Sequence, residues 1–219
     1  MNIVGPILFF LFAQFTISAI SENTSQVTLL AAEKISLEKR YSNPYVNDIF
    51  KDNILLNLNY LSGKVTKKDD INWDEIRRPF NYRFKLAPNE TFAYHEDVLE
   101  KYKNSLVKTT NADFNFDDGF KSDGYLAGDG ICHLASLIYW VAKNAGLDAY
   151  APVNHDFAQI PEIDREYGVS IYKTPGNTTA NAMQNLYITN NKMYAVTFEF
   201  DYNNDELKLS IFETANPKL

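Results

Sequence analysis

Cys132 and His155 are the residues whose types and spacing point most directly to chemistry. Cys132 is the only cysteine and lies at the start of a predicted helix, and His155 follows the short strand-like run after that helix. In many thiol enzymes a histidine so placed takes the cysteine proton, while a carboxylate orients the ring. Asp148 and Asp164 are candidates for that carboxylate. The alternative is structural, because free cysteines often pack as small hydrophobic side chains.

Residues near this pair extend the candidate site. His133 directly follows Cys132, so on a helix the two side chains diverge by about 100°. We expect an exposed or capping histidine there, with a place at the mouth of a pocket as the alternative. Backbone amides near Gly130 to Cys132 are candidates to stabilise an oxyanion, and Asp129, Gly130 and His133 are candidate binding residues. Glu90 lies in a turn, where its carboxylate either caps backbone amides or reaches the pocket.

We expect neither a metal nor another cofactor. The candidate metal ligands do not have the spacing of a compact zinc site; they are Cys132, His133, His155 and Asp156. The acid-rich stretch 113–123 lacks the regular Asp spacing and the distal Glu of a calcium-binding loop. A solvated loop is therefore the better interpretation of that stretch.

The helix that carries Cys132 is predicted over residues 131–145. Its apolar side chains recur at the three- and four-residue spacing of one buried helical face. Asp129 is expected as the N-cap, and Gly146 as the left-handed residue after the last turn. Cys132 then lies in the first turn, where unpaired amides and the helix dipole favour a thiolate.

The remaining periodicity indicates an α+β fold. A helix is predicted to start at Pro44, residues 53–61 fit either a helix or a strand, and residues 80–86 alternate as a half-buried strand. After His155, runs joined by Asn-rich turns predict an antiparallel meander at 169–172, 186–189, 193–200 and 207–212. The predicted architecture is a central helix, carrying the cysteine at its N-terminus, packed on this antiparallel β-meander.

Composition limits the classes of function. The chain has 219 residues, of which 45% are hydrophobic and 22% charged, as in a soluble globular protein. Its formal net charge is −7, and no lysine or arginine block stands out. A nucleic-acid partner is therefore not expected, because phosphate binding needs a concentrated basic surface.

The first twenty residues differ from the rest because they carry no charged side chain. We interpret residues 1–21 as a signal peptide or an N-terminal membrane anchor, so the protein is expected to be exported, with any membrane contact made only by this segment. Residues 22–40 are predicted to be a polar tether, and residues 41–219 a single domain.

Two stretches of the chain resemble the VanW family, an accessory family of vancomycin-resistance clusters. One signature is matched by Pro88-Asn89-Glu90-Thr91-Phe92-Ala93-Tyr94, and the other by Gly128-Asp129-Gly130-Ile131-Cys132-His133. A later histidine segment and a closing element follow in the family's order, matched by Asn154-His155-Asp156-Phe157 and by residues 186–191. Asn89, Asp129 and His133 depart from the family's usual Gly, Gly and Gln.

The resemblance implies an extracytoplasmic protein of the cell envelope, with Glu90, Cys132 and His155 at the matching motif positions. The expected function is an accessory or binding module that acts on peptidoglycan or its peptides. The alternative is a thiol-dependent amidase, peptidase or acyl-transferase with a Cys132–His155 dyad. Expected partners are a cell-wall peptide or glycan, or an envelope protein.

Overall fold

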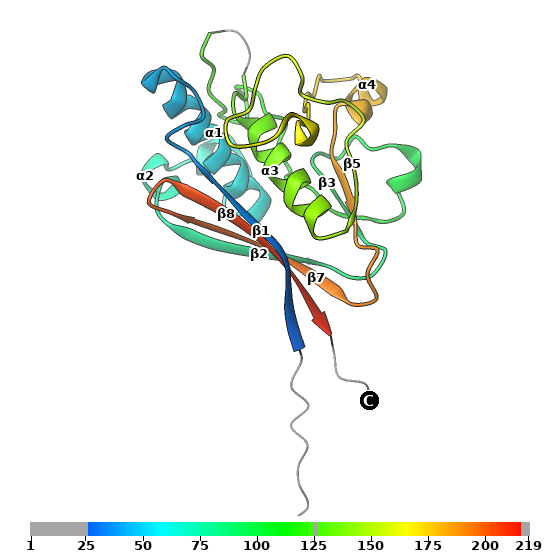
Figure 1. Cartoon of the computed structure of the whole chain (residues 1–219). Helices are drawn as coiled ribbons and strands as arrows, with labels where there is room; N and C mark the ends of the chain where they lie inside the picture. Colours follow the sequence, from blue (N-terminus) through cyan, green and yellow to red (C-terminus); the bar gives the residue numbers. More distant parts are fainter. Residues whose placement is uncertain (1–25, 125–126, 216–219) are drawn as a thin grey trace, which may run out of the picture.

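The computed structural model describes residues 26–124 and 127–215 and shows two four-stranded sheets beside two long helices (Figure 1). The predicted leader, 1–21, lies outside the described residues. The strands are β1 (Gln26–Ser36), β2 (Phe80–Leu86), β3 (Thr91–Ala93), β4 (Leu106–Lys108), β5 (Asp148–Tyr150), β6 (Tyr187–Thr189), β7 (Ala195–Asn203) and β8 (Glu206–Ala215). The α-helices are α1 (Pro44–Ser62), α2 (Trp73–Ile76), α3 (Ile131–Asn144) and α4 (Thr178–Met183).

The larger sheet has the order β1-β8-β7-β2, and all its pairs are antiparallel. β2 has the predicted bounds, and Phe84 stacks on Phe198 of β7 with ring centroids 4.7 Å apart. Such offset aromatic pairs add to the stability gained from burial alone. The predicted tether is corrected here, because most of it forms β1, which pairs with β8 from Gln26 to Ser36. In Figure 1 both strands extend together below the body of the molecule.

The smaller sheet has the order β4-β3-β6-β5. β3 pairs parallel with β4 and antiparallel with β6, which also pairs with β5. The strands predicted to follow one another in a single meander therefore lie in two sheets, with β6 in one and the β7–β8 hairpin in the other. Residues 169–172 were also predicted as a strand but form no ladder.

α1 resolves the ambiguity of residues 53–61 in favour of a helix. It starts at Pro44 as predicted, and the Asn43 side chain accepts a hydrogen bond from the Tyr45 amide at 3.0 Å. This N-cap satisfies one of the amides that the first turn leaves open. Gly63 ends the helix in the left-handed conformation, with φ of 76°.

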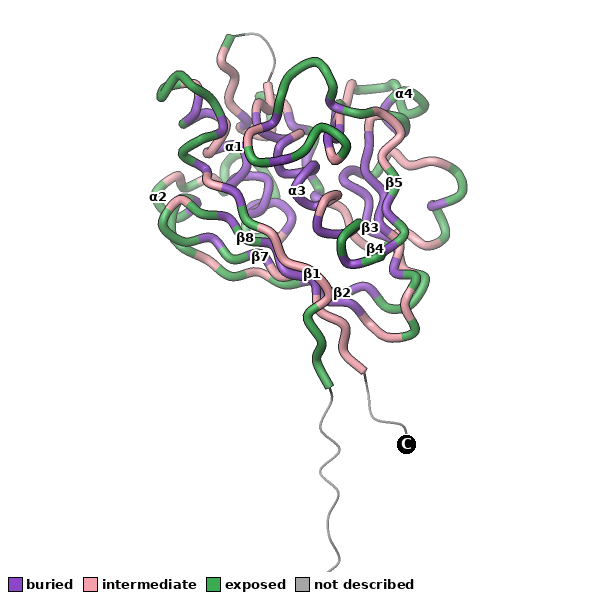
Figure 2. Tube along the Cα trace, viewed as in Figure 1, coloured by how far each residue is buried: buried purple, intermediate pink, exposed green. Residues whose placement is uncertain are grey.

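α3 lies beside α1 and contacts β1 and β8 of the larger sheet and β5 of the smaller one. Much of it is buried in Figure 2. Its buried apolar side chains keep the predicted spacing, among them Ile131, Leu134 and Ile138. Gly146 follows its last turn with φ of 67°, and the Gly146 amide donates to the Lys143 carbonyl, as expected of a left-handed C-terminal residue. Among the described residues, no helix is long and apolar enough to cross a membrane.

Candidate functional site

A cavity of about 560 Å³ lies at the start of α3 and contains most of the predicted site. The predicted residues that line it are Asp129, Gly130, Cys132, His133 and His155. Segments distant in sequence complete the wall with Arg40, Tyr41, Phe50, Phe157, Gln159, Ile171, Tyr172 and Gln184. The fold therefore brings the cysteine and both histidines to one concave site. We name it the α3 cavity.

Glu90 does not line the α3 cavity. It lies in the turn between β2 and β3, where its Oε2 accepts a hydrogen bond from the Ala87 amide at 2.7 Å. Asn89 takes the left-handed conformation with φ of 66°, which an asparagine tolerates better than most residues. Of the two roles considered for Glu90, the structure therefore shows the capping one.

The first turn of α3 is closed by backbone rather than by the predicted Asp129 side chain. Gly130 is the N-cap, and no side chain caps it. Its carbonyl accepts from the His133 and Leu134 amides, and its left-handed φ of 93° suits glycine. A Cβ at Gly130 would stand 2.7 Å from the Phe50 carbonyl oxygen, so no side chain fits there. Asp129 instead accepts from the Asp123 amide at 2.9 Å.

Asn53 of α1 holds the loop that leads into α3, a role that sequence periodicity did not indicate. Its Nδ2 donates to the carbonyls of Lys121 and Asp129 at 3.0 and 2.9 Å, and its Oδ1 accepts from the Lys121 amide at 2.8 Å. Asn53 is fully buried. Asn53 directly precedes the apolar run 54–56, and this polar residue beside that run was the signal that could have identified it, because buried amides need partners.

The Cys132 thiol contacts backbone, not an imidazole. Its Sγ accepts from the Ile171 amide at 3.4 Å and donates to the Ile171 carbonyl at 3.7 Å. Burial raises the pKa of the thiol to about 11, against the lowering expected at a helix start. One turn later, Ser136 Oγ accepts from the Val169 amide at 2.9 Å. Cys132 and Ser136 thus hold residues 169–171 against α3, and the Ser170 and Tyr172 amides donate to the carbonyls of Val153 and Gln184.

His155 is buried, and its ring orientation comes from backbone rather than from the carboxylates considered above. Nδ1 lies 3.2 Å from the Ala158 carbonyl, so this nitrogen carries the proton. The ring packs 4.0 Å from that of Phe157. Burial lowers the pKa of His155, which keeps the imidazole neutral near neutral pH.

His133 is buried, contrary to the expectation of an exposed or capping residue. It is only 5% exposed, because its ring packs against Phe50 of α1 at 5.0 Å and lies 6.3 Å from His155. Nδ1 has no hydrogen-bond partner. Burial, then the charge of Arg40 and the neighbouring His155, lowers the pKa of His133 to about 3. A buried polar atom without a hydrogen-bond partner costs free energy. A ligand that forms a hydrogen bond with this nitrogen would recover that cost.

Two other polar side chains of the lining, Arg40 and Gln184, differ in whether their polar atoms have hydrogen-bond partners. Arg40 is fully buried and already bonded: Nε donates to the Ser36 carbonyl at 2.8 Å, one terminal nitrogen donates to the Pro161 carbonyl at 3.2 Å, and the other pairs with Glu162. The Oε1 of Gln184, by contrast, is buried and has no partner.

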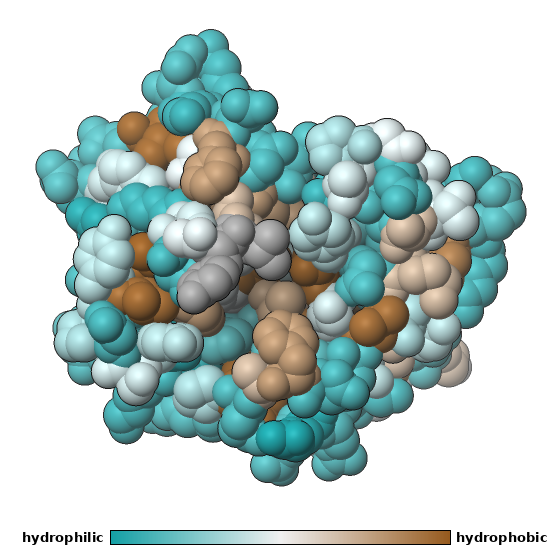
Figure 3. Space-filling view, turned by 90° about the horizontal axis from the view of Figure 1, so that it is seen from above, coloured by the Kyte–Doolittle hydropathy of each residue, from teal (hydrophilic) through white to brown (hydrophobic). Residues whose placement is uncertain are grey.

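Exposed aromatic side chains surround the mouth of the α3 cavity. Tyr41, Phe157 and Tyr172 are 49%, 79% and 51% exposed, and all three line it. Figure 3 shows hydrophobic side chains at several places on the upper face, some of them near its middle, within a mainly hydrophilic surface. Such aromatic groups next to a partly apolar cavity are typical of binding sites.

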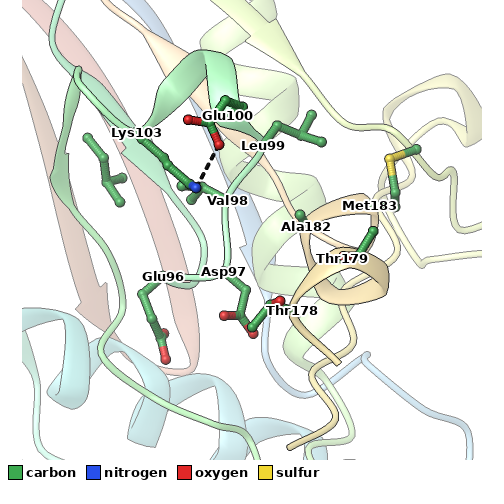
Figure 4. Close-up of a pocket in the computed structure, with 11 residues that line it drawn as sticks. Glu96, Asp97, Val98, Leu99, Glu100, Lys103, Thr178, Thr179, Ala182 and Met183 are labelled. Atoms are coloured by element: carbon green, nitrogen blue, oxygen red, sulfur yellow. Dashed lines mark ion pairs between the residues drawn. The ribbon is translucent and has the colours of Figure 1, made fainter. Parts of the chain in front are cut away.

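A second cavity, of about 620 Å³, lies between residues 96–106 and α4, and we name it the α4 cavity (Figure 4). Its carboxylates already have partners: Glu100 pairs with Lys103, Glu96 pairs with Lys173, and Asp97 accepts from Asn181. Among the described residues that line it, none has a buried polar side-chain atom without a partner.

Fold and site together define an α+β domain with a ligand-sized cavity at the start of its central helix, lined by a cysteine and two histidines. The family model described as VanW like protein matches residues 83–212, more than half of the chain. The chain therefore belongs to the VanW-like family, which is associated with vancomycin resistance. No curated protein and no solved structure matches it.

Proposed function

We propose that this protein is an exported, non-catalytic module of the cell envelope that binds peptidoglycan fragments in the α3 cavity. The observation that supports binding is that two residues of the lining, His133 and Gln184, each hold a buried polar atom without a partner, Nδ1 and Oε1. Membership of the VanW-like family supports an envelope ligand. β1 begins at the end of the molecule away from the start of α3, so a preceding anchor would leave the cavity free (Figure 1).

The state of the thiol favours binding over catalysis. A nucleophilic cysteine reacts as the thiolate, and enzymes lower its pKa to obtain one. Here burial raises the pKa of Cys132 to about 11, and both hydrogen bonds of the sulfur go to Ile171. We therefore assign Cys132 a structural role, in which its hydrogen bonds position Ile171 in the lining of the cavity.

Cosedimentation with purified, insoluble peptidoglycan tests the binding proposal. Ala158→Trp places a large side chain at an exposed position of the α3 cavity, and Thr179→Trp does the same in the α4 cavity. The native protein and the Thr179→Trp variant should cosediment, and Ala158→Trp should remain in the supernatant. Equal binding by both variants, or none by the native protein, would refute the proposal.

A thiol hydrolase is the second candidate, because Cys132 and His155 line the same cavity and Nε2 of His155 is the nitrogen left as a base. Incubation with muropeptides, followed by mass spectrometry, distinguishes the two candidates. We expect no turnover by the native protein. Cleavage that Cys132→Ser abolishes would establish the enzyme instead.

A further inference from the structure

We infer that the α3 cavity recognises the glycan strand of peptidoglycan through an uncharged N-acetylated amino sugar, rather than through the peptide stem. The inference rests on the proposed function and adds the class of ligand. Three properties of the described lining lead to it: its charge, its unpartnered polar atoms and its exposed aromatic rings.

The charge of the described lining excludes a strong carboxylate site. Arg40 is the only lysine or arginine in it, and its guanidinium is bonded to Ser36, Pro161 and Glu162. Lowered pKa values keep both histidines neutral near neutral pH. Asp129 adds a carboxylate, which repels an anion. Peptide stems carry free carboxylates, and burying one without a partner is costly.

The start of α3 would ordinarily attract an anion, because helix N-termini present unpaired amides. Here two of these amides have partners within the backbone. The Ile131 amide donates to the Gly128 carbonyl, and the His133 amide donates to the Gly130 carbonyl. The tight Gly-Asp-Gly turn thus satisfies two of the donors that a phosphate or carboxylate would need.

The two unpartnered atoms match an uncharged polar ligand. Gln184 Oε1 is an acceptor and needs an O–H or N–H, whereas His133 Nδ1 donates or accepts according to the tautomer. An acetamido sugar supplies hydroxyl groups, an amide N–H and a carbonyl, all without charge. Because a protein site built around such polar atoms loses affinity for ligands that leave them unpaired, these atoms also provide specificity.

The aromatic rim matches the other face of a sugar. A pyranose ring presents C–H groups, and the negative face of an aromatic ring attracts their partial positive charge. Tyr41, Phe157 and Tyr172 offer such faces from three separate segments. The volume of about 560 Å³ is in the range of small-molecule sites.

Calorimetric titration with three probes tests the inference. Tetra-N-acetylchitotetraose should bind, and its fully deacetylated analogue and a stem pentapeptide should bind at least about tenfold more weakly. Phe157→Ala should weaken binding of the acetylated probe about tenfold, by the loss of one aromatic contact. Phe116→Ala is the matched control, because Phe116 is 59% exposed and does not line the cavity.

The outcomes separate the two proposals. Binding of the stem pentapeptide in preference to the sugar would overturn this inference and leave the proposed function intact. Failure of all three probes and of whole peptidoglycan would overturn both.

A variant of His133 tests the role of its Nδ1 atom. His133→Phe retains a ring of similar shape but has no ring nitrogen, so the affinity of this variant for the acetylated probe should fall. An unchanged affinity would contradict the role of Nδ1.

Discussion

The α3 cavity and the α4 cavity have similar volumes, about 560 Å³ and about 620 Å³, but different polar groups. In the α4 cavity Glu100 pairs with Lys103, as Figure 4 shows, and Glu96 and Asp97 have partners in Lys173 and Asn181. The α3 cavity leaves His133 Nδ1 and Gln184 Oε1 unsatisfied. Volume alone would favour the α4 cavity, whereas hydrogen-bond accounting favours the α3 cavity. Unpaired buried groups are the more informative sign, because their cost is recovered when a ligand binds.

Gly130→Ala, at the start of the α3 cavity, should have the largest effect on stability. The left-handed backbone and the close approach of the Phe50 carbonyl should together cost about 3 kcal/mol of unfolding free energy. Gly176→Ala, in the turn before α4, is the control: its φ of 78° is similar, but its Cβ would meet nothing. That change should cost only about 1 kcal/mol in urea unfolding. Equal losses would show that the α3 turn is no tighter than a surface turn.

The reactivity of Cys132 comes next. With a pKa of about 11, little thiolate is present near neutral pH. Iodoacetamide should therefore alkylate the native protein about a hundredfold more slowly than the urea-unfolded chain at about pH 8. Mass spectrometry of timed samples gives both rates. Fast alkylation with a pH midpoint well below that of free cysteine would instead identify a dyad thiolate.

His133 should make the α3 region sensitive to acid. Its pKa is about 3 in the folded protein and about 6.5 when unfolded, so the unfolded chain binds more protons between these values. Its contribution to stability is therefore complete above this window and is lost as the pH falls through it. From about pH 7 to about pH 5, His133→Gln should lose about 2 kcal/mol less unfolding free energy than the native protein. Parallel pH dependences of the two proteins would contradict the buried neutral state.

The smallest effect should be at the α4 cavity. Glu100→Gln breaks the ion pair with Lys103, in which both side chains are exposed. The change in unfolding free energy should stay within about 0.5 kcal/mol, since exposed pairs contribute little. Calorimetric binding of the acetylated probe should not change. A marked loss of binding would mean that the ligand also reaches the α4 cavity.

The local sequence pattern predicted the helices and strands near the site better than the contacts between side chains within it. The α3 helix, its C-terminal glycine and the strand 80–86 follow from periodicity that adjacent residues determine. The tether prediction for 22–40 was wrong in most of its length because β1 depends on β8, at the other end of the chain. The strand predicted at 169–172 shows the same limit: this segment joins neither sheet, and contacts with Cys132 and Ser136 hold it against α3.

Helix periodicity and turn chemistry are local, so neighbouring residues alone predict a helix that begins near Cys132 and a glycine-rich turn before it. The roles of those residues depend on tertiary contacts. Phe50 of α1 buries His133, Arg40 is bonded to Glu162, and Ile171 binds the sulfur of Cys132. Each of these contacts joins segments far apart in the chain. The burial and the pKa of the site residues depend on such contacts. For this reason only the folded chain shows that the Cys132 thiol is bonded to the Ile171 backbone and that His133 Nδ1 has no hydrogen-bond partner.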